Sequence, residues 1–124
     1  MKSFTHLNEI PPTTRSGEHA GIGEIHFRRL WSAEDFATPI DFLDFTIIPP
    51  QSTIGWHPHK GNEEAYFIVA GAPLVRVEQN LRRLAKGDVS VVRSGQSHEL
   101  INDTEENVEI LVFQVRIVSE EGSK

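Results

Sequence analysis

Apolar and polar residues alternate in short runs along most of this chain. Such alternation is typical of β-strands, in which successive side chains point to opposite faces. It predicts strands over residues 21–30, 42–48, 53–59, 64–70, 74–79, 89–93, 97–101 and 108–118. Turn-forming residues such as Asn80 and Gly87 separate several of these runs. Ser32, followed closely by two acidic residues, predicts one short helical turn, and no longer helix is indicated.

Many short strands with almost no helix predict an all-β fold, either a sandwich or a barrel. The chain has 124 residues, which is the size of one domain with a single core. We expect residues 1–20 to form an irregular N-terminal arm, residues 21–118 the barrel and residues 119–124 a frayed tail. Phe45, Phe67 and Phe113 lie in apolar strands, so they are expected in the core.

Composition narrows the classes of function. The net charge is -6, which argues against nucleic acid as a partner because nucleic acids attract basic surfaces. The one local basic cluster, formed by Arg82, Arg83 and Lys86, is expected to be a solvated turn. No apolar run is long enough to cross a membrane, and the first residues lack an apolar signal segment. The chain has no cysteine, which excludes disulfides and thiolate ligands and fits a cytoplasmic protein.

Four side chains with metal-binding chemistry occur in strand-like sequence. His57 and His59 are two residues apart, so on an extended strand both imidazoles point to the same face. The next strand begins near Glu64, and its return along the first would bring this carboxylate towards the pair. With His98, the set comprises three imidazoles and one carboxylate, which suit Mn, Fe, Ni, Cu or Zn.

A simpler interpretation exists for these residues. A pair of histidines at this spacing is often only the polar face of a strand. Glu63 is expected to be a solvated neighbour of the site, and His6, His19 and His26 have no partners at ligand spacing. His26 lies in a predicted strand, so it either lines a cavity or belongs to an exposed face.

Two segments resemble the paired motifs of the cupin superfamily. The first comprises His57, Pro58, His59, Glu64 and, after six further residues, Gly71; the second comprises Gly87, Gly95, His98 and Asn102. Arg93 departs from the family, which usually has proline at this position in a turn outside the metal site. The resemblance implies a double-stranded β-helix, or jelly-roll barrel, that binds one divalent ion (Zn, Mn, Ni or Fe). The ligands it implies are His57, His59, Glu64 and His98.

The resemblance does not fix one reaction, because cupins host many chemistries. Four protein ligands leave two of six octahedral positions open, so a small oxygenated metabolite could chelate the ion through two oxygens. Our first interpretation is isomerase, cyclase or lyase chemistry through a metal-bound enolate. The alternatives are an iron-dependent dioxygenase and a non-catalytic cupin that binds a metal or a small ligand.

Strand parity predicts that two further residues reach the ligand pocket. Tyr66 lies two residues after Glu64, and Gln96 lies two residues before His98, so each shares a face with a metal ligand. Both are candidate substrate-binding residues, and Tyr66 is the candidate catalytic acid or base, with its pKa lowered by the ion. The alternatives are that Tyr66 is a packed barrel aromatic and that Gly95 bends the strand that carries Gln96.

The N-terminal arm bears on the oligomeric state. Phe4, Leu7 and Ile10 are apolar and need a place to bury. They would cover a sheet edge either of the same barrel or of a partner. Cupins of this size commonly pair, so the resemblance implies a homodimer, and a strap within one chain is the alternative.

Overall fold

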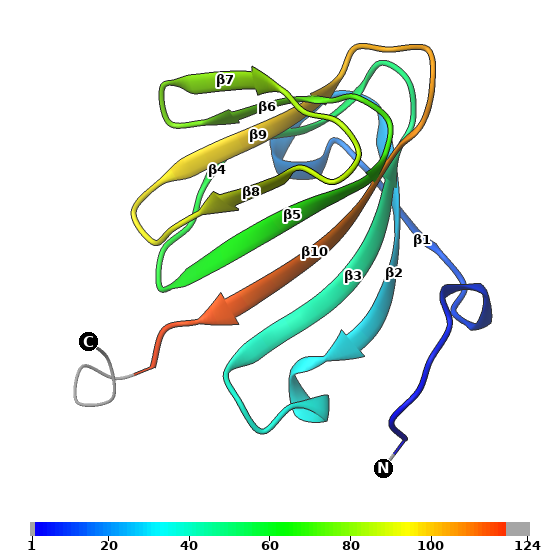
Figure 1. Cartoon of the computed structure of the whole chain (residues 1–124), viewed down its shortest axis with the longest axis vertical. Coiled ribbons are helices and arrows are strands. Elements are labelled where there is room, and N and C mark those ends of the chain that lie inside the picture. Colours follow the sequence, from blue (N-terminus) through cyan, green and yellow to red (C-terminus); the bar gives the residue numbers. More distant parts are fainter. Residues whose placement is uncertain (1, 119–124) are drawn as a thin grey trace.

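The structure, a computed structural model, describes residues 2–118 and consists mainly of strands (Figure 1). The tail expected at residues 119–124 lies outside the described residues. In chain order the elements are η1 (Leu7–Glu9), β1 (Thr13–Ser16), η2 (Glu18–Ala20), β2 (Glu24–Ser32), η3 (Ala33–Asp35), β3 (Ile40–Ile48), β4 (Ser52–Pro58), β5 (Asn62–Ala70), β6 (Leu74–Val77), β7 (Asn80–Arg83), β8 (Val89–Val92), β9 (Ser97–Asn102) and β10 (Val108–Arg116). Within residues 2–118, no helix has the length and apolar character needed to cross a membrane.

The strands form two antiparallel sheets that face each other. The larger sheet has the strand order β1-β2-β3-β10-β5-β8, and the smaller has the order β4-β9-β6-β7. Strands far apart in sequence become neighbours, since β10 lies between β3 and β5 and β9 lies between β4 and β6 (Figure 1). This arrangement confirms the all-β prediction and is the double-stranded β-helix, or jelly-roll barrel.

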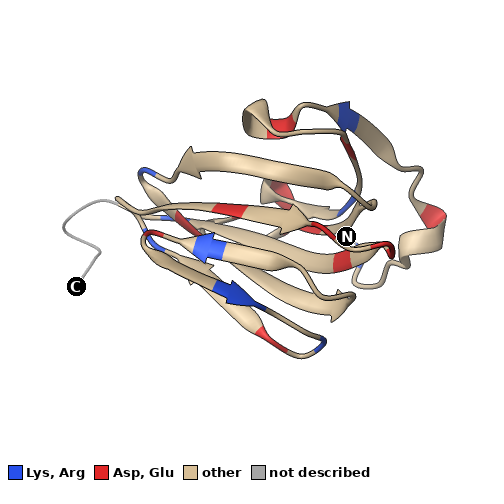
Figure 2. Cartoon of the chain, turned by 90° about the horizontal axis from the view of Figure 1, so that it is seen from above, with Lys and Arg blue, Asp and Glu red and all other residues tan. Residues whose placement is uncertain are grey.

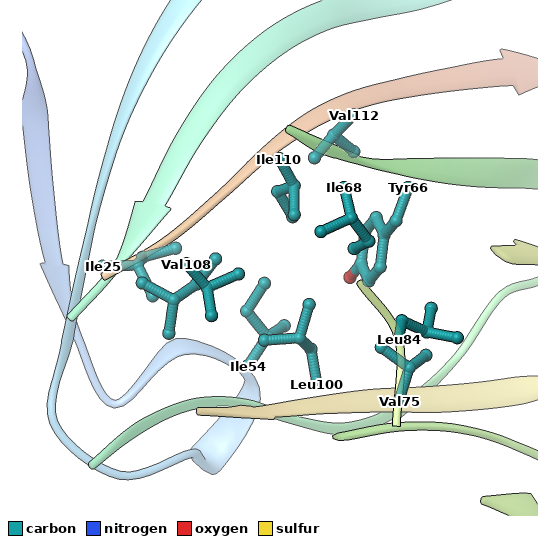
Figure 3. Close-up of a cluster of buried hydrophobic side chains, with 11 residues drawn as sticks. Ile25, Ile54, Tyr66, Ile68, Val75, Leu84, Leu100, Val108, Ile110 and Val112 are labelled. Atoms are coloured by element: carbon teal, nitrogen blue, oxygen red, sulfur yellow. The ribbon is translucent and has the colours of Figure 1, made fainter. Parts of the chain in front are cut away.

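The core fills the space between the two sheets (Figure 3). Ile68 and Ile110 point inward from the larger sheet, and Ile54 and Leu100 point towards them from the smaller sheet. Burying one such side chain stabilises the fold by about 1.5–3 kcal/mol. Tyr66 belongs to the same cluster, so the core continues directly into the site described below.

The outer face of the larger sheet carries exposed aromatic side chains. Phe67 of β5 and Phe113 of β10 are 42% and 43% exposed, whereas Phe45 is buried. The prediction that all three belong to the core is therefore wrong for Phe67 and Phe113. Strand parity is the reason, because Glu64 and Tyr66 face inward on β5 and Phe67 must then face outward.

The alternation of apolar and polar residues predicts neither β7 nor β1. β7 replaces the solvated turn expected around Arg82 and Arg83, and it pairs with β6 across a tight turn at Glu78 and Gln79. Glu78 adopts a φ of 54°, without the Asn-Gly sequence that commonly marks such a hairpin. β1 lies within the arm that was expected to be irregular, and all its residues are exposed, so no apolar alternation indicates it.

Charged residues are interspersed over the strands and loops of both sheets, with no stripe of a single sign in the view of Figure 2. The net charge of the chain is -6. Because this charge is spread out, the field that a small ligand meets depends mainly on the residues that line its own cavity.

Candidate metal centre

A β-bulge in β4 determines where the first predicted ligand points. Ile54 faces inward in regular register with Leu100 of β9, but the register shifts between Ile54 and His57. One extra residue reverses the alternation along the strand. His57 therefore faces inward as well, directly opposite His98 of β9.

His59 and Glu64 complete the group from two other positions. His59 follows β4, and its backbone forms hydrogen bonds with Gln96 O (2.9 Å) and Gly95 N (2.8 Å) in the turn before β9. Glu64 projects inward from β5. The structure thus brings the four predicted ligands together, with their ligand atoms within 4.8 Å of one another and all four residues buried.

The ligand atoms are spaced like corners of an octahedron. The Nε2 atoms of His57, His59 and His98 are separated by 3.1 to 3.2 Å. Glu64 Oε1 lies 3.3 Å from His59 Nε2 and 3.2 Å from His98 Nε2. At metal–ligand distances of about 2.1–2.2 Å, neighbouring corners are about 3.0–3.1 Å apart in an octahedron and about 3.4–3.6 Å apart in a tetrahedron. His57 Nε2 and Glu64 Oε1 make no such short contact, as expected of opposite corners.

Hydrogen bonds on the far side of two imidazoles orient their lone pairs. His57 Nδ1–H donates to Gly55 O at 2.7 Å, and His59 Nδ1–H donates to Asn62 Oδ1 at 2.6 Å. A neutral ring with its proton on Nδ1 has a lone pair on Nε2. Both lone pairs therefore point at the centre of the group. His98 Nδ1 is buried without a hydrogen-bond partner among the described residues.

The protonation states of the group favour a cation. Burial raises the pKa of Glu64, but in the metal-free group, where His59 and His98 can carry a proton on Nε2, their hydrogen bonds outweigh burial and lower this pKa to about 2. Burial lowers the pKa of His57 to about 4, so its imidazole is neutral at pH 7. Burial also lowers the pKa of His98, whereas Glu64 and Asn62 overcome burial at His59 and raise its pKa. Without a metal ion, His59 is the imidazole that takes up a proton most readily.

The residues present fit a divalent transition-metal ion. Imidazole lone pairs and an ionised carboxylate converge in a buried space, where a cation relieves their mutual repulsion. This nitrogen-and-oxygen donor set suits several ions, among them Mn, Fe, Ni, Cu and Zn. The His/Glu group is therefore positioned to hold a metal ion.

Three of the four residues, His57, His59 and Glu64, line a cavity of about 340 Å³ whose wall is formed by residues of both sheets. The N-terminal segment forms part of the same wall, because His19 of η2 stacks on His57 with 3.6 Å between ring centroids. A Cβ atom at Gly55 would lie 2.2 Å from His19 O. Only glycine at this position lets the segment approach β4 so closely.

Sequence reasoning missed several charged and polar residues of this wall. Arg29 and Asp44 face each other from β2 and β3, with Nε–Oδ1 at 2.9 Å and Nη2–Oδ2 at 3.0 Å. The inward parity of Ile25 and Phe27 on β2 was the signal that could have placed Arg29 in the cavity. No such signal exists for the residues of the N-terminal segment. The missed residues with charged or titratable side chains are Arg15, Glu18, His19, Arg29 and Asp44.

Tyr66 lines the cavity beside the group, where strand parity places it. Its hydroxyl lies 3.4 Å from His98 Nε2, and its ring stacks on the His98 imidazole at a centroid distance of 4.8 Å. Burial, reinforced by the negative charge of Glu64, raises the pKa of Tyr66 well above its usual value, so the hydroxyl stays protonated. Burial and Glu64 therefore oppose the lowering of the Tyr66 pKa that we expect from a bound metal ion. Figure 3 shows the same ring packed against the core.

The structure places Gln96 outside the cavity lining. The Gln96 side-chain Oε1 accepts a hydrogen bond from Arg93 N at 2.9 Å. The backbone N–H of Gln96 donates to Arg93 O at 3.0 Å, and the two bonds close a tight turn. Gly95 has a φ of 93° in this turn, so the regular alternation before His98 is lost. The prediction that Gln96 points into the pocket is therefore wrong. Gln96 instead closes the turn to which the backbone of His59 is bound.

Comparison with known proteins gives four matches, one to a family and three to individual chains. The cupin domain family matches residues 44–114. An oxalate-binding protein from Thermotoga maritima is 30% identical over 104 residues, which cover 84% of this chain and 86% of that protein. The crystal structure of a predicted oxalate decarboxylase from Thermotoga maritima has a TM-score of 0.90 and 27% identity, and the match covers 93% of this chain and 100% of that one. A cupin 2 conserved barrel domain protein from Salinispora arenicola shares the fold, with a TM-score of 0.69, 17% identity and coverage of 93% and 88%.

Proposed function

This chain belongs to the cupin domain family, and from that premise we propose that it binds one divalent transition-metal ion and acts on a small oxygenated acid. The four predicted ligands, His57, His59, Glu64 and His98, would hold the ion, and Zn, Mn, Ni and Fe are the candidates. The single observation that carries the proposal is the octahedral spacing of their ligand atoms. A cytoplasmic location stays a prediction, supported by the absence of cysteine.

The spacing favours a ligand that offers two oxygens. An ion held by His57, His59, Glu64 and His98 would have room for two further ligand atoms side by side, on the side of the group that faces the cavity. Adjacent positions accept a chelating pair of oxygens, as a hydroxy-acid, a keto-acid or a dicarboxylate provides. Oxalate is such a chelator, and the similarity of this chain to a protein named for binding oxalate supports this ligand class.

We infer isomerase, cyclase or lyase chemistry as the first candidate reaction. A divalent ion at this position supplies Lewis-acid stabilisation of negative charge that develops on an oxygen of the acid, as enolate formation requires. The protonated hydroxyl of Tyr66 lies 3.4 Å from His98 Nε2, so it can donate a hydrogen bond or a proton to an acid bound beside that histidine. Ile54 and Val112 form a buried apolar part of the wall that keeps water away.

Proton exchange next to a keto group tests this function. We expect the Zn-loaded protein to accelerate exchange of the C3 protons of 2-oxobutyrate with ²H₂O, measured by loss of their NMR signal. The physical reason is that a C3 proton passes to solvent while negative charge develops on the keto oxygen, and a deuteron from solvent then takes its place on C3. Tyr66→Phe removes only the hydroxyl, so zinc content and unfolding temperature should stay unchanged while the exchange rate falls by about a hundredfold.

Each other outcome of this experiment has a defined meaning. Unchanged exchange in the Tyr66→Phe variant would reduce Tyr66 to a packed aromatic. Tight binding of the acid without any exchange would favour the second candidate, a non-catalytic cupin that binds a small ligand, which the name of the oxalate-binding relative supports. Consumption of dioxygen by the Fe-loaded protein would instead indicate an iron-dependent dioxygenase.

We also propose that the protein forms a homodimer. Phe4 is 88% exposed, although the N-terminal segment contacts β2, where Arg28 Nε donates to Ile10 O at 2.8 Å; in Figure 1 this segment lies outside the barrel, beyond β2. On the outer face of the larger sheet, Phe67, Phe113 and Val89 are 42%, 43% and 55% exposed. Apolar surface of this kind is commonly covered by a partner, and a second copy would bury both the face and the arm.

Sedimentation at micromolar concentration is expected to give twice the chain mass of 14.0 kDa. A Phe67→Glu/Phe113→Glu variant should sediment as a monomer, because it places charges on the outer face. Leu81→Glu is the matched control, since Leu81 is 56% exposed on β7 in the other sheet. A mass near 14.0 kDa for the unmodified chain would reject the dimer.

A further inference from the structure

The N-terminal wall of the cavity carries a guanidinium with free donors. Arg15 lies on β1 opposite Ile25, which faces the core, and it lines the same cavity as the metal-centre residues. Among the described residues, its side chain makes one hydrogen bond, to Glu18 Oε2 at 3.4 Å. A guanidinium has five N–H donors in a planar fork, so most of this fork is available to a ligand.

Arg29, the second arginine of the cavity, is already engaged. Its Nε and Nη2 bind both carboxylate oxygens of Asp44, at 2.9 and 3.0 Å. Its Cζ also lies 5.6 Å from the ring centroid of Phe27 and 4.6 Å from that of Phe42. Because Arg29 is held on all these sides, Arg15 is the arginine that a ligand can engage.

The ring of Phe27 packs against the guanidinium of Arg15. The Cζ of Arg15 lies 4.7 Å from the ring centroid of Phe27, within the range of a cation–π contact. Phe27 is buried, so the guanidinium rests on a fixed surface while 51% of the Arg15 side chain remains exposed. A cation positioned in this way loses little conformational freedom when it binds an anion.

Glu18 is the carboxylate that would compete with a ligand for the Arg15 guanidinium. Its Oε2 lies 3.4 Å from Arg15 Nη1 and 3.8 Å from His19 Nε2. Strong charge-assisted hydrogen bonds are about 2.7–2.9 Å long, so both contacts are loose. A ligand carboxylate that reaches the Arg15 fork at ordinary distances would therefore bind it more strongly than Glu18 does.

We propose that Arg15 forms a second anion-binding position in the cavity, for a carboxylate of the ligand that does not chelate the metal ion. The ligand is then a chelating keto-acid or hydroxy-acid with a second carboxylate farther along its chain. This inference rests on the proposed function and narrows its ligand class. The cavity of about 340 Å³ agrees with it, since pockets of about 300–1,000 Å³ enclose ligands much larger than a two-carbon acid.

Two acids of equal chain length separate this position from chelation. 2-Oxoglutarate and 2-oxovalerate offer the metal the same keto-acid oxygens, but only 2-oxoglutarate has a distal carboxylate. Calorimetric titration of the Zn-loaded full chain is expected to show tighter binding of 2-oxoglutarate. Arg15→Gln should weaken 2-oxoglutarate binding by about tenfold or more and leave 2-oxovalerate binding unchanged. Arg15→Lys, which keeps the charge, should retain part of the preference.

Arg76 provides a matched control outside the cavity. It forms a similar ion pair, with Glu99 at 3.5 Å, its side chain is 49% exposed, and its Cζ lies 5.0 Å from the Trp56 ring centroid. Arg76→Gln should leave both affinities unchanged, and zinc content is measured on every variant.

The outcomes separate this inference from the function on which it rests. Suppose that both acids bind. If Arg15→Gln then weakens the binding of both acids equally, or leaves the binding of both unchanged, the anion-binding position at Arg15 is overturned while the metal-dependent binding stands. If neither acid binds the Zn-loaded protein, the proposed function fails and the inference fails with it.

Discussion

Replacing His59 with alanine is expected to lower the affinity for a divalent metal ion by more than about a hundredfold. His59 Nε2 has short separations to all three other ligand atoms: 3.2 Å to His57, 3.1 Å to His98 and 3.3 Å to Glu64 Oε1. Losing a residue that only orients a metal ligand already lowers metal affinity by about 10- to 100-fold, so losing the ligand itself should lower the affinity further. Elemental analysis after purification without added metal, followed by titration with Zn²⁺ or Mn²⁺, measures the effect.

The same loss should appear in thermal unfolding. A metal present at 1,000 times its dissociation constant adds about 4 kcal/mol to the free energy of unfolding, and a His59→Ala variant that binds a hundredfold more weakly should lose about 2.7 kcal/mol of this increment. His26→Ala is the control, because His26 Nδ1 pairs with Thr14 Oγ1 at 2.8 Å and does not line the cavity. Stoichiometric metal in a His57→Ala/His98→Ala double variant would contradict the assignment.

The ligand group was predictable because its chemistry is distinctive and its spacing follows strand alternation. The sequence could not reveal the bulge in β4, however. Counted from inward-facing Ile54 without the bulge, His57 would point outward, so the extra residue is what turns it towards His98. The same rule failed at Gln96, because the turn at Gly95 interrupts the strand on which the counting depends.

The N-terminal wall of the cavity was not predictable at all. Its approach to β4 depends on the absence of a side chain at Gly55 and on left-handed backbone at His19 (φ 51°) and Ala20 (φ 62°). Such conformations are uncommon for residues other than glycine, and local sequence rarely announces them. Tertiary contacts thus decide that His19, which has no partner at ligand spacing in the sequence, stacks on His57.

The fold was predictable where burial alternates and obscure where it does not. The paired sheets follow from many short alternating runs, but β1 is exposed throughout and its sequence carries no such pattern. Phe67 shows a further limit, because apolar character alone does not distinguish the core from an outer face that remains exposed.

Replacing Asn102 with alanine is expected to lower the free energy of unfolding by about 2–4 kcal/mol. Asn102 is fully buried at the end of β9. Its Nδ2 donates to Ile48 O and Glu106 O, both at 2.8 Å, and its Oδ1 accepts from Thr104 N at 3.0 Å and Thr104 Oγ1 at 2.6 Å. One side chain therefore joins the end of β3 to the loop between β9 and β10. Without it, Ile48 O loses its partner in a buried position and the groups of Thr104 and Glu106 lose theirs in partly buried ones, at a cost of about 1–3 kcal/mol for each group that water does not reach.

Urea unfolding of the metal-free protein, in the presence of a chelator, measures this loss without a contribution from the metal centre. A decrease of about 3 kcal/mol corresponds to a drop in unfolding temperature of roughly 10 °C for a domain of this size. Asn102→Asp should destabilise at least as much, because it sets carboxylate oxygens against the two carbonyls that Nδ2 now serves. Asn80→Ala, at an exposed position on β7, should change the free energy of unfolding by less than about 0.5 kcal/mol. An Asn102→Ala variant as stable as Asn80→Ala would mean that water fully replaces these hydrogen bonds, and the structural role assigned to Asn102 would be wrong.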